Sequence, residues 1–315
     1  MRISNIEGLR GKGLLALTTI FLVDNGSLRP EATKQLRKIA AALSKRLRRK
    51  VEPVSLLHSS AIPASQLGGR EAEILNDAVL RRLERGAREF VIVPLFFGRS
   101  RALTVFIPEL MEQWKKHSPE MTVRIAAPLA ARGDDRLARI LERQVRAKLT
   151  NRLRGQFVRV ALVDHGSPVK VVTQVRNRLA SQLRRRLGSD VAAVAGCSME
   201  IPRRGQPLTL VVADAKRTLK ATRSISHARL QGLGADPIEP LLENVLAQPH
   251  WNSGAVIVAQ LFLLPGRHAG AGGDVEMICQ RAREESPGLR TVRTKLVGED
   301  PGLIAILADR FGAVK

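Results

Sequence analysis

Two histidines follow apolar segments, each in a glycine-containing turn. His165 lies in the turn 164–167 (DHGS), directly after the apolar run 159–163, and His268 ends the turn 265–268 (PGRH), directly after the run 255–264. Neutral imidazoles bind borderline divalent metals, and a histidine also serves as a general acid or base. If the two runs are neighbouring strands of one sheet, we expect both rings to face one site.

Short apolar runs alternate with amphipathic runs along the whole chain, which predicts an α/β fold with helices on both faces of a parallel sheet. Continuously apolar strands such as 89–97 are typical of such doubly covered sheets. In the first half the expected strands are 18–23, 51–57, 89–97 and 122–127, and the expected helices are 30–47, 71–86, 107–117 and 134–149. In the second half the expected strands are 159–163, 191–196, 255–264 and 290–296, and the expected helices are 172–187, 240–247, 275–283 and 301–311.

The second half repeats the first. The turn 24–27 (DNGS) matches 164–167 at an offset of 140 residues, and Leu95-Phe96 matches Leu261-Phe262 at an offset of 166. We therefore predict two tandem domains, 1–152 and 153–315, with an insertion in the second domain at about 205–235. The insertion is basic and has no clear periodicity, so it is either a surface loop or flap beside the site, or an unstructured segment.

The repeats differ at the positions that could do chemistry. In each case the second half carries a titratable or metal-binding side chain and the first half carries one that cannot do that work. The pairs are His165 with Asn25, His268 with Ala102 and Glu200 with Ser60. This asymmetry predicts one working site, in the second half, and a first half retained for its shape.

The three polar groups of the second half are expected at one edge of its sheet. Ligands of open parallel sheets bind outside the carboxyl ends of the strands, and His165, Glu200 and His268 each follow a predicted strand. Two imidazoles suit Co²⁺, Fe²⁺ or Ni²⁺, and the carboxylate could complete the coordination or accept a proton.

The net charge of +23 indicates an anionic partner, either nucleic acid or an acidic small molecule. Aromatic residues make up only 3% of the chain, and tyrosine is absent, which leaves few stacking platforms for nucleic acid. No apolar run approaches the roughly 20 residues of a membrane span. The chain has no GxxxxGK[ST] loop for a nucleotide, and two cysteines without a CxxC motif fit a reducing cytoplasm.

At these turns the chain resembles the class II chelatases, namely the sirohydrochlorin cobaltochelatases and ferrochelatases of the CbiX/SirB type. Segment 163–167 (VDHGS) resembles the family's GHGS-like turn, with Asp164 where glycine is commoner, and 260–268 (QLFLLPGRH) resembles its PLFL-x-x-GRH-like turn. Asp274 matches the acidic position that follows. The first half shows the same skeleton without the histidines, at 23–27, 93–98 and 106–108.

The resemblance implies two chelatase-like domains and insertion of a divalent metal (Co²⁺, Fe²⁺ or Ni²⁺), without ATP or another nucleotide, into sirohydrochlorin in sirohaem or cobalamin biosynthesis. His165 and His268 would hold the metal, and Glu200 would help to take the pyrrole N–H protons. Basic and polar groups would bind the carboxylates of this anionic tetrapyrrole; the candidates are Arg101, Arg203, Arg204, Arg267 and Ser167. We expect a monomer whose two domains form one cleft. Alternatives are a non-catalytic protein that binds the metal or the tetrapyrrole, and, less favoured, a nucleic-acid-binding protein.

Overall fold

The computed structural model describes residues 18–149, 157–167, 169–199 and 240–314. Within them, each half of the chain forms one four-stranded parallel sheet. The first half contains β1 (Thr19–Asp24), α2 (Pro30–Leu47), β2 (Val51–Ser55), α3 (Leu75–Glu84), β3 (Glu89–Pro94), the π-helix η3 (Ala102–Phe106), α4 (Ile107–His117), β4 (Thr122–Ile125) and α5 (Arg136–Arg146). The second half contains β5 (Arg159–Asp164), α6 (Lys170–Leu187), β6 (Ala193–Ser198), α7 (Leu242–Ala247), β7 (Gly254–Gln260), α8 (Asp274–Glu285), β8 (Leu289–Arg293) and α9 (Gly302–Gly312).

The two sheets have the same topology. Their strand orders are β2-β1-β3-β4 and β6-β5-β7-β8, with every pairing parallel. In each sheet the second strand of the chain pairs with one side of the first strand, and the third strand pairs with its other side. Ligands of open α/β sheets bind at such a switch point, outside the carboxyl ends of the strands. In the second sheet this point lies between β5 and β7.

Both faces of each sheet are covered, and the residues of a strand divide between the two faces with the period of two that a strand imposes. In β1, Ile20 and Leu22 belong to one core while Phe21 and Val23 belong to another, on the side of α3 and α4. In β5, the corresponding second face packs against α7 and α8. The remaining faces of the two sheets share one continuous apolar core. The central strands are therefore apolar at nearly every position.

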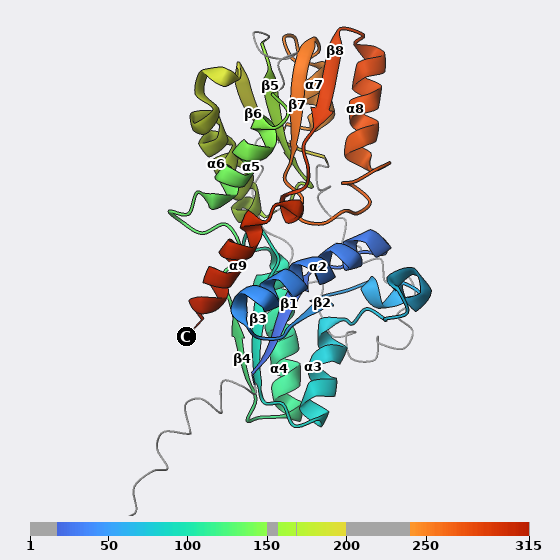
Figure 1. Cartoon of the computed structure of the whole chain (residues 1–315), viewed down its shortest axis with the longest axis vertical. Helices are drawn as coiled ribbons and strands as arrows, with labels where there is room; N and C mark the ends of the chain where they lie inside the picture. Colours follow the sequence, from blue (N-terminus) through green and yellow to red (C-terminus); the bar gives the residue numbers. More distant parts are fainter. Residues whose placement is uncertain (1–17, 150–156, 168, 200–239, 315) are drawn as a thin grey trace, which may run out of the picture.

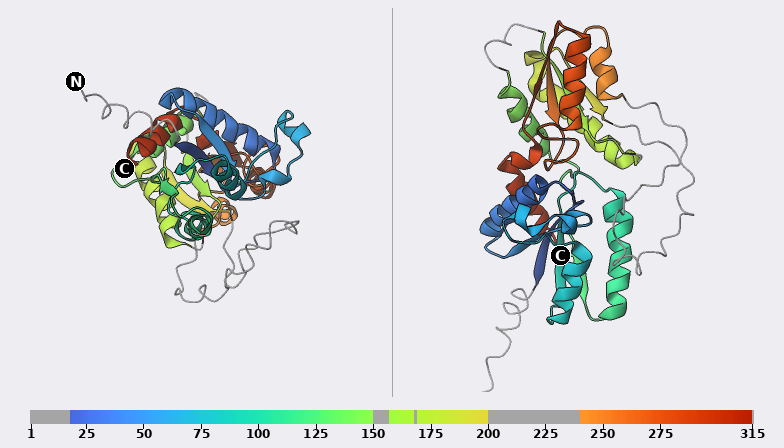
Figure 2. Two further views of the ribbon diagram at one scale, coloured as in Figure 1. Left: turned by 90° about the horizontal axis from the view of Figure 1, so that it is seen from below. Right: turned by 90° about the vertical axis from the view of Figure 1, so that its right-hand side faces the viewer.

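The last helix of each half packs against the other half. Helix α5 lies on α6 and β7 of the second sheet, whereas α9 lies on α2 and β3 of the first. Figure 1 shows this exchange: α5 stands beside α6 in the upper unit, and α9 lies beside α2 in the lower one. The side view in Figure 2 shows the two units stacked along the long axis of the molecule. The exchange explains why the inner core is continuous.

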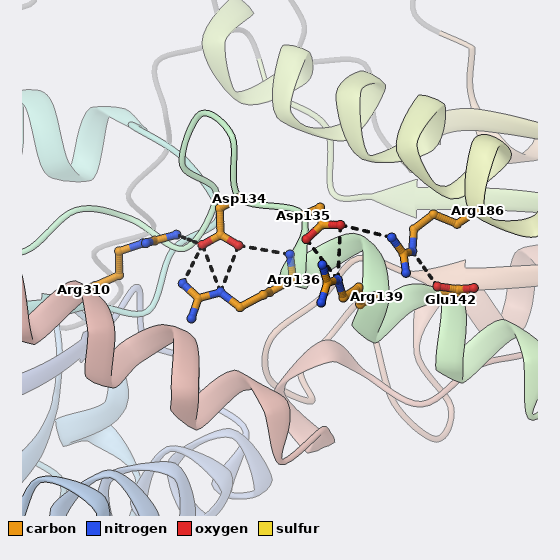
Figure 3. Close-up of polar contacts among 7 residues, drawn as sticks. All are labelled: Asp134, Asp135, Arg136, Arg139, Glu142, Arg186 and Arg310. Carbon is orange, nitrogen blue, oxygen red and sulfur yellow. Dashed lines mark hydrogen bonds and ion pairs between the residues drawn. The ribbon is translucent and has the colours of Figure 1, made fainter.

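Ion pairs fasten the exchanged helices, as Figure 3 shows. Asp134, just before α5, receives hydrogen bonds from Arg136 (Nη2–Oδ2 2.7 Å) and from Arg310 of α9. Arg310 Nε also donates to the carbonyl oxygen of Pro128 at 3.0 Å. Arg186 of α6 bridges to Asp135 (3.1 Å) and to a glutamate of α5. We call these groups the polar clamp; its residues are Asp134, Asp135, Arg136, Arg139, Glu142, Arg186 and Arg310.

The expected α/β class and the paired parallel sheets are confirmed. The helix expected from residue 71 is shorter, because the main chain at 73–74 runs along β2 instead: Ser55 N donates to Glu73 O at 3.1 Å, and Ile74 forms a bridge with Ser55. The π-helix η3 was not expected. The domain boundary at residue 152 and the insertion at 205–235 lie outside the described residues and stay predictions. No helix of the described part is long and apolar enough to cross a membrane.

Candidate functional site

His165 is presented by a tight turn at the end of β5. Asp164, the last residue of the strand, is buried, and its Oδ1 accepts a hydrogen bond from Gly166 N at 3.1 Å. Gly166 has a φ of 92°, a conformation that glycine adopts without steric cost. Ser167 Oγ then accepts a hydrogen bond from Val169 N at 3.1 Å, just before α6 begins. The turn leaves the His165 side chain exposed.

His268 is held in the loop between β7 and α8. Its carbonyl oxygen accepts a hydrogen bond from Val275 N at 3.1 Å, and a Cβ on Gly273 would lie only 2.9 Å from that same oxygen. The loop therefore requires glycine at 273. The side chain of His268 is 20% exposed, and its Nδ1 lies 2.7 Å from Asp274 Oδ2. Metal-binding histidines commonly use such a carboxylate to fix the ring and its tautomer.

The structure brings the two imidazoles together. The ring centroids of His165 and His268 are 4.4 Å apart, with an angle of 87° between the planes. Two nitrogen ligands of one ion lie roughly 3 Å apart, given metal–nitrogen bonds of about 2.1 Å. Since the carboxylate of Asp274 accepts the Nδ1 proton of His268, Nε2 is the nitrogen of that ring suited to coordination. Pairing between β5 and β7, seen in Leu261 N donating to Val163 O at 2.8 Å, sets this proximity.

The other predicted site residues are less closely grouped. Arg267 is 78% exposed and its Nε lies 3.8 Å from Asp274 Oδ2. Ser167 is half-buried in the His165 turn, and Arg101 is half-buried in the first domain, directly before η3. Glu200, Arg203 and Arg204 lie outside the described residues. Within the described part, no group of three or more His, Cys, Asp or Glu side chains could hold a metal ion.

The site edge of the second sheet faces turns of the first domain. A Cβ on Gly266 would lie 3.9 Å from Ser27 Oγ, and one on Gly98 would lie 3.0 Å from Val175 Cγ2. Gln35 Nε2 of α2 donates to Gly298 O at 2.8 Å across the same boundary. The first domain therefore contributes surface beside the histidines, although its own counterpart positions carry none.

The equivalent edge of the first sheet has a different electrostatic character. Asp24, which corresponds to Asp164, is buried, and its Oδ1 has no hydrogen-bond partner among the described residues. Burial raises the pKa of Asp24 to about 6, although hydrogen bonds from Ser55 and the backbone oppose the rise. In the second domain Asp164 instead pairs with Arg176, with 3.2 Å between Nη1 and Oδ1.

Arg176 and Gly273 were missed at the sequence level, and each had a detectable signal. Arg176 is a charged residue on the face of α6 that otherwise buries Val175, Leu179 and Leu183. Gly273 ends the glycine-rich stretch 270–273 just before α8. Cys197 of β6 is buried in the core, and burial raises the pKa of its thiol above the ordinary value. A protonated thiol is a poor metal ligand.

Two other concave regions do not include either imidazole. A cavity of about 600 Å³ beside β2 is lined largely by charged groups that pair with one another, such as Arg82 and Glu73 at 2.8 Å. A groove of about 460 Å³ runs between α7 and α8 and includes Asp274 at its edge. The chemistry-bearing residues are instead at the switch point of the second sheet.

Comparisons with known proteins agree on the architecture. Residues 19–148 match the CbiX family model. The structure of SirB from Bacillus subtilis with Fe³⁺ is similar with a TM-score of 0.63 at 14% identity, over 94% of each chain. SirB from Bacillus subtilis subspecies spizizenii in complex with cobalt gives 0.60 at 13% identity, over 93% of each chain. CbiX, described as the terminal enzyme for biosynthesis of siroheme in denitrifying bacteria, gives 0.52 at 16% identity, over 94% of this chain and 98% of the other.

At these identities the structural likeness establishes the fold. Among curated protein sequences, none is significantly similar to this chain. The family match covers the first domain, which is the one without the histidine pair.

Proposed function

Since residues 19–148 match the CbiX family model and the fold of the chain is similar to that of the SirB and CbiX structures, we propose that the protein inserts a divalent metal ion into an anionic tetrapyrrole. The proposed substrate is sirohydrochlorin or a close relative, and Co²⁺ or Fe²⁺ is the proposed metal. The proposed working site is in the second domain. No nucleotide takes part.

The observation that carries the proposal is the pair of imidazoles 4.4 Å apart at the switch point of the second sheet. In the proposed site, His165 and His268 hold the incoming ion through their Nε2 atoms. Asp274, 2.7 Å from His268 Nδ1, keeps that ring in the required tautomer and strengthens it as a ligand. A small number of protein ligands is an advantage for this reaction, because the ion must leave the protein for the macrocycle.

Charge supports the choice of an anionic macrocycle. The chain carries a net charge of +23, which attracts a polycarboxylate and raises its local concentration. Arg267, beside His268 and largely exposed, and Arg101, on the first domain, are the proposed partners of substrate carboxylates. Ser167 is proposed to add a neutral hydrogen bond.

Insertion must also dispose of two protons, because a divalent ion replaces two pyrrole N–H protons. Glu200 is the proposed first acceptor, through the family resemblance. Each imidazole that gives up the ion regains a basic nitrogen, so His165 and His268 can accept protons as the metal departs. The two protons that are accepted carry the same charge as the divalent ion that is inserted, so no other reactant is needed.

The test is an insertion assay on the full chain with sirohydrochlorin and Co²⁺, Fe²⁺ or Ni²⁺, followed by the absorption spectrum. His165→Ala and His268→Ala should each lower the rate of insertion by about 100-fold or more, because the loss of even a supporting contact to a metal ligand costs about 10- to 100-fold. Asn25→Ala and Ala102→Ser, at the equivalent positions of the first domain, are the matched controls and should insert metal at the normal rate.

Unchanged rates in both histidine variants would refute the proposed site. A protein that only carries metal or tetrapyrrole would shift the absorption bands on binding without producing the metallated spectrum. Circular dichroism on every variant separates lost chemistry from lost fold.

A further inference from the structure

A buried arginine lies beneath the histidine turn. Arg176 of α6 is 1% exposed. Its Nη1 donates to Asp164 Oδ1 at 3.2 Å and also to Ser198 Oγ, and its Nε and Nη2 donate to Asn177 Oδ1 at 3.1 and 2.9 Å. A guanidinium inside a protein is costly unless it is well paired, so this set of partners is a built feature of the domain.

The partners of Arg176 are the ends of two neighbouring strands. Asp164 is the last residue of β5 and directly precedes His165, whereas Ser198 is the last residue of β6 and pairs with Asp164 in the sheet register. Gly196 of β6 lies directly against this group, because a Cβ there would lie 3.4 Å from Arg176 Nε and 3.3 Å from Asn177 Oδ1. One guanidinium thus ties together the two strand ends that lead into the site.

The first domain forms the same sheet without this tie. Leu36, also 1% exposed, occupies the position of Arg176 at the offset of 140 residues. Pro53 occupies the register position of Gly196. Asp24 and Ser55 are retained at the strand ends, and Asp24 is left with a buried oxygen that has no partner among the described residues. The fold therefore does not require an arginine here, and the arginine accompanies the domain that carries the histidines.

We propose that Arg176 is a positioning residue that locks the ends of β5 and β6 into the register that presents His165 to the metal. This inference rests on the proposed function. Arg176 is buried beneath the turn, so its effect passes through Asp164 to the His165 turn and through Ser198 to the end of β6. Its removal should loosen the geometry of the metal ligands and leave the binding of the macrocycle intact.

The test is the affinity of the full chain for Co²⁺, measured by isothermal titration calorimetry, together with steady-state insertion kinetics. Arg176→Leu, which installs the residue of the first domain, should weaken Co²⁺ binding by about 10- to 100-fold, the range typical of lost supporting contacts around a metal ligand. It should lower kcat and leave KM for the tetrapyrrole unchanged. Arg176→Lys keeps the charge but not the forked geometry, so its affinity should lie between those of Arg176→Leu and the parent.

Arg176→Leu leaves Asp164 buried without its cation, so folding needs its own control. The double variant Arg176→Leu/Asp164→Asn removes both charges and keeps an oxygen for Gly166 N; it should fold and still bind Co²⁺ weakly. Asp164→Asn alone should bind within a few-fold of the parent. Normal binding by the double variant, or a full loss with Asp164→Asn alone, would overturn the role of Arg176.

Two further variants separate this inference from the proposed function. Arg178→Leu, at an exposed position on the same helix, should bind Co²⁺ normally. If His165→Ala binds Co²⁺ as the parent does, the proposed metal site itself fails. If His165→Ala loses binding while Arg176→Leu retains it, only the positioning role fails.

Discussion

The two domains share a sheet, a strand order and a buried aspartate at the end of the first strand, but they surround that aspartate differently. Asp164 is paired with Arg176, and the histidine turn rests on it. Asp24 has the same place in the first sheet, with Leu36 in place of the arginine and no histidine in the turn. The comparison teaches that the apolar positions specify the scaffold in both halves. The polar groups around the buried aspartate, in contrast, differ between the domain that carries the histidines and the domain that does not.

The largest effect should come from the apolar positions that the domains share. Leu22 and Leu162 are equivalent, both are fully buried, and both belong to the continuous inner core. Leu22→Ala and Leu162→Ala should each cost about 2–5 kcal/mol in the free energy of unfolding, because each leaves a cavity. Chemical denaturation should show one transition, lowered in both variants. Two transitions, each sensitive to one variant only, would show that the domains unfold independently.

Asp24 should make the first domain sensitive to pH. Because its pKa in the folded state is raised to about 6 from an ordinary 3.8, the ionised carboxylate is disfavoured inside the protein. This group therefore lowers stability progressively as pH rises from about 4 to 6, by on the order of 3 kcal/mol once pH exceeds 6. Asp24→Asn should raise the melting temperature at pH 8, and the gain should vanish below pH 4. An equal gain at both pH values would contradict this explanation.

The substitution of Asp274 in the second domain should have a smaller effect. It should lower the affinity for the metal ion rather than the free energy of unfolding. Asp274→Asn weakens the acceptor for His268 Nδ1, so Co²⁺ affinity should fall by about 10- to 100-fold. The first domain has a carboxylate in the corresponding helix turn, Glu109 of α4. Glu109→Gln should leave the Co²⁺ affinity unchanged, and equal losses in the two variants would argue for a general electrostatic effect.

The smallest effect should come from an exposed ion pair beside the polar clamp. Asp309 of α9 pairs with Arg136, but its side chain is 61% exposed. Asp309→Asn should change the free energy of unfolding by less than about 1 kcal/mol, because water screens such pairs. Asp134→Asn should cost more, since Asp134 is 14% exposed and pairs with both Arg136 and Arg310. Thermal unfolding of the two variants side by side measures the difference.

Much of the fold could be predicted because it depends on local patterns. Apolar strands, helical periodicity and the repeat at an offset of 140 residues predict both sheets and their parallel pairing. The exchange of α5 and α9 could not be predicted, because either packing buries the same apolar face of each helix. Helix α3 begins after residue 71, where the sequence predicts its start, because the main chain at 73–74 pairs with β2. The periodicity of side chains carries no information on such backbone hydrogen bonds.

The proximity of His165 and His268 followed from strand order, since both turns end at one edge of a parallel sheet. The role of Asp164 did not. Its pairing with Arg176 joins a strand end to a helix, and only the three-dimensional arrangement shows which charges meet. A charged residue at a position where the repeat has leucine was the available signal, at 176 against 36.

The exchange of the last helices has a consequence for the order in which the molecule can be completed during synthesis. The first sheet leaves the ribosome early, yet the helix that covers part of its inner face is formed by residues 302–312, which are made only after all four strands of the second sheet. Helix α5 likewise waits for β7, more than a hundred residues later in the chain. Domains usually fold in the order in which they are made. Here the first sheet cannot be fully covered until the second sheet has been made, so neither half can close by itself.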